Sequence, residues 1–156
     1  MCKGCLRLYR HTAVASLGVA VLLLVTGCGK PVPPPLPDGS TWLLERIETP
    51  EDTLIAEGFD DDPKLYFSGE TNADTLASKR LSGYTGCNAL HGVYEVSAEA
   101  QIRLGNFATT RQYCDGEPGR LEAALLEYLP NVSTYALEQN RLQLRFEGGA
   151  FYFVAN

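Results

Sequence analysis

The sequence contains little that could support catalysis or hold a metal ion. It has two histidines, His11 and His91, and only one methionine and one tryptophan. A Ser-His-Asp site needs a histidine base within hydrogen-bond reach of its nucleophile, and the sequence contains no nucleophile-elbow motif. A zinc site would need a second close pair of ligands besides Cys87 and His91. We therefore expect no enzymatic activity, no metal site and no cofactor.

The chain also lacks a long hydrophobic run near its N-terminus. The apolar stretch over residues 13–25 has about 13 residues, whereas a membrane-spanning helix needs roughly 20. Basic residues precede this stretch and small residues end it, which is typical of a secretory signal. The segment Leu24-Val25-Thr26-Gly27-Cys28 is similar to a bacterial lipobox. The sequence thus predicts a signal peptide over residues 1–27 and lipidation of Cys28; the alternative is an ordinary buried cysteine.

A lipidated Cys28 would anchor the protein to a membrane without crossing it, because two acyl chains such as palmitate suffice for stable anchoring. Gly29, and not aspartate, follows this cysteine, which favours the outer membrane, facing the periplasm, by resemblance to the sorting rule of enteric bacteria. Residues 28–40 are rich in proline and predict a stiff polyproline II tether with a reach of about 37 Å. The folded domain is expected over residues 41–156.

Basic residues are scarce. The chain has 13 Lys and Arg against 19 Asp and Glu, a net charge of −6. Removal of the predicted signal peptide takes away three basic residues and no acidic one, which leaves ten against 19 and a charge of −9. Nucleic acid and anionic lipid both require a basic surface. Besides the membrane that holds the anchor, the expected partner is therefore an envelope protein or a small molecule.

Five cysteines are present, and three are assigned by position. Cys2 and Cys5 lie in the signal segment, and Cys28 is the lipidated residue. Cys87 and Cys114 remain, and in an oxidising compartment such a pair becomes a disulfide that stabilises by roughly 3–4 kcal/mol. Two buried reduced thiols are the open alternative, because spacing alone does not bring the two Cα atoms within about 7 Å.

The predicted domain consists mainly of short strands. Alternation of apolar and polar residues is clearest over residues 141–146, and a turn at Gly148-Gly149 leads into a final strand. Such alternation predicts an antiparallel sheet with one buried face and one solvated face. The other expected strands cover residues 42–44, 53–56, 64–67, 81–84, 92–98 and 102–107, with a polar connection over residues 68–77.

A single helix is expected after Pro118, which suits a first helical turn. Leu121, Leu125 and Leu129 recur at helical spacing and form an apolar stripe, whereas Glu122 is expected to face away from it. The predicted fold class is α+β: a curved antiparallel β-sheet or partial barrel with a single covering α-helix.

With these elements in place, the sequence resembles the META/HslJ family of small bacterial envelope domains. The resemblance implies the same α+β fold and an association with heat shock, motility or novobiocin resistance, and it brings no catalytic residue. Gln112 and Tyr113 depart from the family pattern, which often has methionine and a small residue there. The resemblance is carried by Trp42-Leu43-Leu44, Leu65-Tyr66-Phe67, Ser82-Gly83-Tyr84-Thr85-Gly86-Cys87-Asn88, Gly92-Val93-Tyr94 and Asn106-Phe107-Ala108-Thr109-Thr110-Arg111 with Cys114.

Two interpretations of the shared polar residues remain open. Structural roles in turns are favoured, and the alternative is a ligand groove lined by Asn88, His91, Thr110 and Arg111. The expected function is that of a non-enzymatic envelope lipoprotein, which serves stress or antibiotic tolerance by binding a protein or a small molecule. The alternative function is an inhibitor of a protease or lysozyme, because an acidic domain attracts a cationic enzyme.

Overall fold

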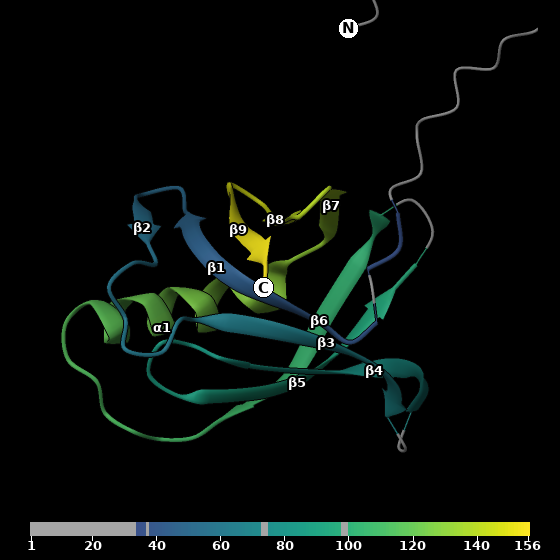
Figure 1. Ribbon diagram of the computed structural model, residues 1–156, viewed down its shortest axis with the longest axis horizontal. Coiled ribbons are helices and arrows are strands. Elements are labelled where there is room, and N and C mark those ends of the chain that lie inside the picture. Colours follow the sequence, from purple (N-terminus) through teal and green to yellow (C-terminus); the bar gives the residue numbers. More distant parts are fainter. Residues whose placement is uncertain (1–33, 37, 73–74, 98–99) are drawn as a thin grey trace, which may run out of the picture. The chain divides into compact units, whose positions relative to one another are not determined.

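The computed structural model describes residues 34–36, 38–72, 75–97 and 100–156 (Figure 1). The predicted signal peptide over residues 1–27 and the predicted lipidation site Cys28 lie outside the described residues. In the part of the chain that is described, no helix has both the length and the apolar character needed to cross a membrane.

Nine strands of the described chain form one antiparallel sheet. The neighbours run in the order β6-β5-β4-β3-β1-β9-β8-β7, and the short strand β2 pairs with β1 beside this path. The strands are β1 (Ser40–Glu48), β2 (Thr53–Ile55), β3 (Lys64–Asn72), β4 (Thr75–Tyr84), β5 (Ala89–Val96), β6 (Ile102–Thr109), β7 (Thr134–Glu138), β8 (Arg141–Phe146) and β9 (Gly149–Ala155).

The strands form where apolar side chains alternate with polar ones. In β8, Leu142, Leu144 and Phe146 are buried, while the residues between them are exposed or half-buried. The terminal hairpin predicted from this pattern is present, with Leu144 opposite Phe151. One face of the sheet therefore supplies the core, and the other face meets solvent.

The sheet curls until its two edge strands approach one another (Figure 1). Gln101, just before β6, forms a bridge with Thr134 at the start of β7. The backbone N–H of Ile102 donates to the carbonyl of Ser133 at 3.1 Å. These contacts turn the sheet into a half-barrel, which confirms the predicted curved sheet or partial barrel.

The helix α1 (Glu117–Tyr128) and the 3₁₀ turn η2 (Leu129–Asn131) complete the core. Pro118 lies in the first turn, as predicted. Leu121, Leu125 and Leu129 are buried in one cluster with residues of the strands, among them Trp42. A single helix thus covers the inner face of the sheet, in agreement with the α+β prediction.

Three features differ from the sequence-based expectations. The strand β7 was not predicted, and β3 and β4 extend into the segment expected to be a polar connection. Glu122 does not face away from the domain, because its carboxylate accepts hydrogen bonds from Thr85 and Asn88. The direction of Glu122 depends on residues far apart in the sequence, whereas the two strand differences depend on hairpin pairing, of β7 with β8 and of β3 with β4.

The folded unit also takes in residues that the sequence assigned to the proline-rich tether. Leu36 is 7% exposed and belongs to the hydrophobic core. The hydroxyl of Tyr135 donates to the carbonyl of Pro34 at 3.2 Å. Asp38 forms an ion pair with Lys79 at 2.9 Å. The chain from Pro34 onwards therefore packs against the domain.

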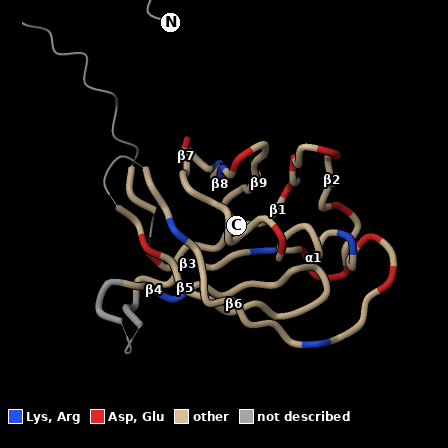
Figure 2. Tube along the Cα trace, turned by 180° about the vertical axis from the view of Figure 1, so that it is seen from behind, with Lys and Arg blue, Asp and Glu red and all other residues tan. Residues whose placement is uncertain are grey.

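Acidic residues are concentrated around β2 and in the segment that follows it, whereas Lys and Arg residues are scattered along the chain (Figure 2). Asp60, Asp61 and Asp62 are exposed in the turn before β3. Asp61 forms an ion pair with Lys64 at 2.6 Å, so this acidic run is a solvated turn.

Candidate functional site

The four residues proposed for a ligand groove lie in different environments. Asn88 is 3% exposed and belongs to a buried polar network, which Thr110 joins. His91 is exposed on the solvent face of β5. Arg111 is exposed in the loop after β6. The structure therefore places these residues in three environments and does not bring them together around one groove.

The buried network is centred on the side-chain amide of Asn88. Its Oδ1 accepts from the Thr110 hydroxyl at 2.7 Å and from the Gln112 backbone N–H at 2.8 Å. Its Nδ2 donates to the Gln112 carbonyl at 2.9 Å and to Glu122 Oε2 at 3.0 Å. Thr85, which is fully buried, donates to Glu122 Oε1 at 3.2 Å. The network joins three segments: the turn before β5, the loop after β6, and α1.

A disulfide reinforces the same junction. Cys87 and Cys114 are bonded, and their Cα atoms lie 6.0 Å apart. This confirms the predicted pair and removes the alternative of two reduced thiols. Cys87 lies next to Asn88, so the covalent and hydrogen-bonded links fasten the loop at neighbouring points.

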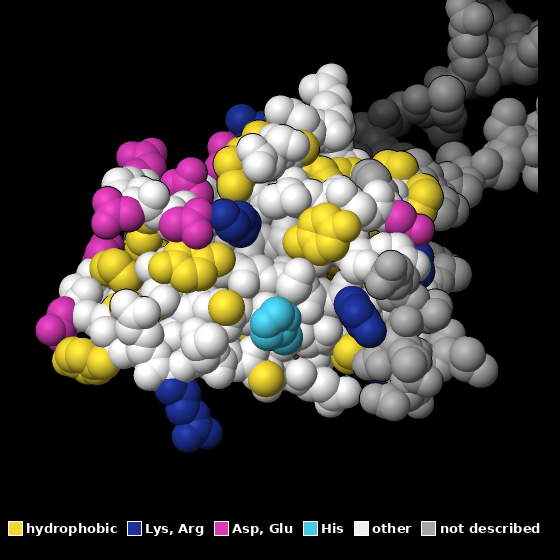
Figure 3. Space-filling model, turned by 60° about the horizontal axis from the view of Figure 1, so that its bottom comes forward, with side chains coloured by type: hydrophobic (Ala, Val, Ile, Leu, Met, Phe, Trp, Pro, Cys, Tyr) yellow, Lys and Arg dark blue, Asp and Glu magenta, His cyan; other side chains and the backbone are white. Residues whose placement is uncertain are grey.

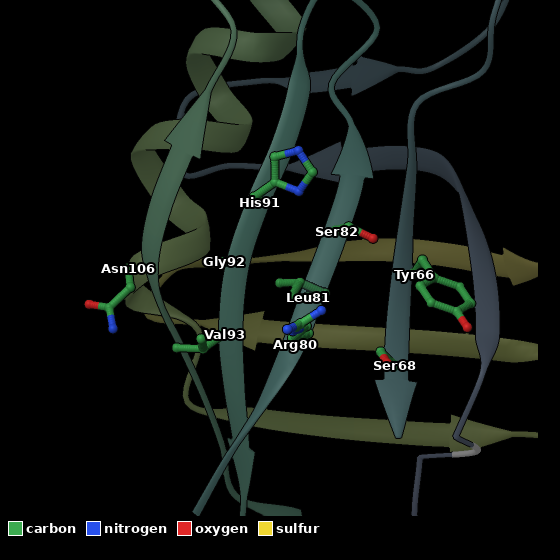
Figure 4. A pocket seen from close by; sticks show the side chains of 9 residues that line it. All are labelled: Tyr66, Ser68, Arg80, Leu81, Ser82, His91, Gly92, Val93 and Asn106. Carbon is green, nitrogen blue, oxygen red and sulfur yellow. The ribbon is translucent and has the colours of Figure 1, made fainter. Parts of the chain in front are cut away.

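A separate groove lies on the solvent face of the sheet, and we call it the sheet-face groove (Figures 3 and 4). It has a volume of about 660 Å³ and is open to solvent. Strands β3, β4, β5 and β6 all contribute to it (Figure 4). The polar or aromatic side chains that line it are Tyr66, Ser68, Arg80, Ser82, His91 and Asn106.

Of the residues that line the groove, the sequence analysis selected His91 alone, and Asn106 is among those that it missed. It has a φ of +53°, which is uncommon for a residue other than glycine, although asparagine tolerates it best. The register between β5 and β6 shifts between His91 and Val93, so Asn106 lies in a β-bulge. A bulge re-aims a side chain, and here that of Asn106 lines the groove. The sequence signal available for this bulge was the Gly105-Asn106 pair, together with Gly92 on the neighbouring strand.

Comparison with known proteins identifies the family. A family model described as the META domain matches residues 35–156. The chain belongs to the META domain family. No protein of curated function matches the sequence significantly.

Two solved structures resemble this META domain. One is the NMR structure of a protein from Burkholderia xenovorans, with 19% identity, a TM-score of 0.59, and coverage of 76% of this chain and 83% of its own. The other is also an NMR structure, with 18% identity, a TM-score of 0.55, and coverage of 75% and 89% respectively. At these identities the likeness establishes the fold alone.

The loop over residues 110–116 of this META domain contains Cys114 of the disulfide and an exposed tyrosine. Tyr113 is 84% exposed, far more than the other exposed large hydrophobic residues that are described. Its hydroxyl donates to Asp115 Oδ1 at 2.5 Å, and this hydrogen bond, followed by desolvation, raises the pKa of Tyr113. Arg111 forms no ion pair with any described residue.

The groove of the META domain contains a serine and a histidine in register. Ser82 on β4 and His91 on β5 are directly paired across the two strands. No hydrogen bond joins their side chains in the described structure, and they point in different directions (Figure 4). Within the same described residues, no three His, Cys, Asp or Glu side chains cluster as metal ligands would. The arrangement offers polar contacts to a bound molecule.

Proposed function

We propose that this META domain protein is a non-enzymatic, lipid-anchored envelope protein that serves stress or antibiotic tolerance by binding a small molecule or a protein. The observation that carries this proposal is the sheet-face groove. Its volume of about 660 Å³ falls in the range of small-molecule sites, and its side chains supply hydrogen-bond donors and acceptors beside the aromatic ring of Tyr66.

The disulfide supports a place in the cell envelope. Cys87 and Cys114 form a bond that persists in oxidising compartments such as the bacterial periplasm. An acyl anchor at Cys28 would be separated from Pro34 by a segment that spans about 19 Å in a polyproline II conformation. Such an anchor would hold the domain close to the membrane, and we propose the periplasmic face of the outer membrane.

A binding role fits the groove better than catalysis. General acid–base chemistry needs a base within about 3 Å of the proton that it takes. Ser82 and His91 share no hydrogen bond, and the network that holds Glu122 belongs to the core junction and not to the groove. The groove therefore supplies recognition, and we propose no bond-breaking step for it.

Complementation of a deletion strain tests the role of the groove. We expect the deletion to lower survival under heat or novobiocin several-fold and the wild-type gene to restore it. A double variant, His91→Ala with Asn106→Gly, should fail to restore survival, because it removes two lining side chains while glycine keeps the positive φ. Glu127→Ala, an exposed change on α1, is the matched control and should restore survival fully.

The outcome that contradicts this function is full restoration by the groove variant at equal protein level. Cys28→Ser tests the anchor separately, and we expect it to move the protein from the membrane fraction to the soluble fraction. Mass spectrometry of the wild-type N-terminus should show acyl chains on Cys28. An unmodified thiol there would contradict the lipoprotein assignment.

A second candidate function, inhibition of a protease or lysozyme, is favoured by a different observation. Tyr113 is 84% exposed on a loop that the Cys87–Cys114 disulfide holds to the domain. A rigid, protruding loop suits insertion into the cleft of an enzyme. The conformational entropy of the loop is lost during folding, so less is lost on binding.

A further inference from the structure

The segment over residues 109–113, which we call the clamped edge, prolongs the free edge of β6. The backbone N–H of Thr110 donates to the carbonyl of Ala89 on β5 at 3.1 Å. Two residues later, both backbone groups of Gln112 bond to the side-chain amide of Asn88, at 2.8 and 2.9 Å. The amide of Asn88 thus takes the place of a neighbouring strand for one residue.

This pairing determines which backbone groups remain available. In an extended chain, successive residues direct their N–H and C=O groups to opposite sides. Thr110 and Gln112 use backbone groups to bond to the domain, and Arg111 and Tyr113 alternate with them along the chain. In the described structure the latter two residues form no backbone hydrogen bond. The clamped edge therefore offers unpaired strand groups to a partner.

The clamped edge is held to the domain by hydrogen bonds to Asn88 and by the disulfide that follows it. Asn88 is 3% exposed, and its contacts to Gln112 lie on the domain side. Cys114, the next residue after the clamped edge, is bonded to Cys87. A Cβ at Gly119 of α1 would lie 2.3 Å from the Cys114 carbonyl oxygen, so the helix packs directly on the end of the loop. Because the loop is already held in place, it loses little further conformational entropy when it binds.

The side chains of the clamped edge are of the kinds that dominate protein interfaces. Arg111 and Tyr113 are both exposed, and arginine and tyrosine are enriched among binding hot spots. Tyr113, at 84% exposed, stands out from the domain and does not line a cavity. The partner must therefore provide the cleft and the pocket, and this domain provides the inserted strand.

We propose that the clamped edge binds in the substrate cleft of an endopeptidase, with Tyr113 in a pocket that accepts an aromatic side chain. This proposal rests on the second candidate function. Strand addition is a recurring mode of peptide recognition, in which backbone hydrogen bonds supply affinity and side-chain pockets supply specificity. The backbone groups of Arg111 and Tyr113, which form no hydrogen bond in the described structure, suit such a cleft, whereas a glycan-binding cleft offers no strand to pair with. The complex is non-covalent, and no bond needs to break.

Titration of two aromatic-accepting serine peptidases tests the proposal. The full-length protein, purified in detergent, is added to chymotrypsin or subtilisin, and residual cleavage of a chromogenic peptide is measured. We expect a stoichiometric loss of activity with at least one of the two enzymes. Tyr113→Ala should weaken inhibition by about 30-fold or more, because loss of a hot-spot aromatic side chain has effects of this size. Tyr113→Phe should keep it.

The control variant is Ile55→Ala, which removes another exposed hydrophobic side chain, on β2 and away from the sheet-face groove. It should inhibit as well as the wild type, and thermal denaturation should show that all variants are folded. Absence of inhibition of both peptidases would overturn the proposal, as would undiminished inhibition by Tyr113→Ala. Rapid cleavage of the chain after Tyr113 without inhibition, or inhibition of hen lysozyme alone, would also overturn it.

The two functional proposals fail separately. If neither peptidase is inhibited but the groove variant still abolishes stress tolerance, only the clamped-edge proposal is wrong. If the peptidases are inhibited and the groove variant complements fully, the groove proposal is wrong and the clamped edge remains.

Discussion

Glu122 links α1 to the turn that contains Asn88, although its place on the helix suggested a solvated side chain. Its two carboxylate oxygens accept from Thr85 and Asn88, which are 0% and 3% exposed. Glu122→Ala would leave both buried donors without this acceptor, which costs roughly 2–3 kcal/mol of unfolding free energy. Denaturant unfolding measures this loss. Glu122→Gln keeps one acceptor oxygen and should cost less, and the exposed Glu127→Ala should change stability by less than about 0.5 kcal/mol.

Tyr94 couples the stability of the core to alkaline pH. It is 2% exposed, its hydroxyl donates to the carbonyl of Ser68 at 2.9 Å, and burial, with a smaller effect of Asp38, raises its pKa to about 12. In the unfolded chain the phenol ionises near its ordinary pKa of about 10. Between these values the unfolded state binds fewer protons than the folded state, so stability falls as pH rises.

The size of this effect is on the order of 2 kcal/mol for a shift of about two units. We expect the unfolding temperature to fall between pH 10 and 12 and the fall to be shallower in Tyr94→Phe, which has no proton to lose. Ile55→Val, an exposed change that removes no ionisable group, is the control and should keep the wild-type slope. Equal slopes for wild type and Tyr94→Phe would show that this phenol does not contribute.

At the scale of secondary-structure elements, the bulge in β6 requires a glycine in the neighbouring strand. A Cβ at Gly92 would lie 2.8 Å from Phe107 and 2.9 Å from the carbonyl oxygen of Gly105. The backbone oxygen cannot rotate away, so Gly92→Ala should destabilise the domain by about 1–3 kcal/mol. Gly105→Ala is a matched control in the same bulge, because nothing lies within 4 Å of its Cβ position. Thermal unfolding of the two variants gives the comparison.

The disulfide fixes the loop before α1 against the turn before β5. Replacement of Cys87 and Cys114 together by serine should lower the unfolding free energy by roughly 3 kcal/mol, since the closed loop constrains the unfolded chain. Amide hydrogen exchange should increase most over residues 110–116, because this loop loses its covalent link to Cys87. A reducing agent should have the same effect on the wild type and none on the double variant. Unchanged exchange in this loop would contradict the proposed clamping.

The elements that could be predicted are those in which apolar residues recur at the spacing of a strand or a helix within the element itself. Leu142, Leu144 and Phe146 alternate within six residues, and Leu121 and Leu125 recur one helical turn apart, so β8 and α1 were visible locally. The strand β7 was not visible, because Tyr135 is its one fully buried residue and the strand exists through its pairing with β8.

The same distinction applies to the candidate site. The pairing of Cys87 with Cys114 was predicted from the expected compartment and the count of cysteines, without any geometry. The place of Asn106 in the groove depends on a register shift between β5 and β6, and the direction of Glu122 depends on where the turn at Thr85 folds. Register and docking between distant segments are tertiary properties, which single-sequence patterns do not contain.

At the scale of the whole molecule, the domain begins before its first strand. Leu36 is 7% exposed in the core, and the carbonyl of Pro34 accepts a hydrogen bond from Tyr135 on β7. The N-terminal segment therefore contacts the far end of the strand order, beyond the neighbours of β1. These contacts supply a third link between the two halves of the half-barrel, beside the bridge of Gln101 with Thr134 and the hydrogen bond from Ile102 to Ser133.

A chain that starts at Thr41 should consequently be less stable than one that starts at Pro31. Loss of a buried leucine side chain costs roughly 2–3 kcal/mol and loss of one hydrogen bond about 1 kcal/mol, which together lower the unfolding temperature by on the order of 10 °C. Leu36→Ala in the longer chain should reproduce most of this loss, whereas Pro35→Ala should reproduce little. If both chains unfold at the same temperature, the segment before Ser40 is only a tether. A lower unfolding temperature for the shorter chain would show that Pro34 and Leu36 belong to the folded domain.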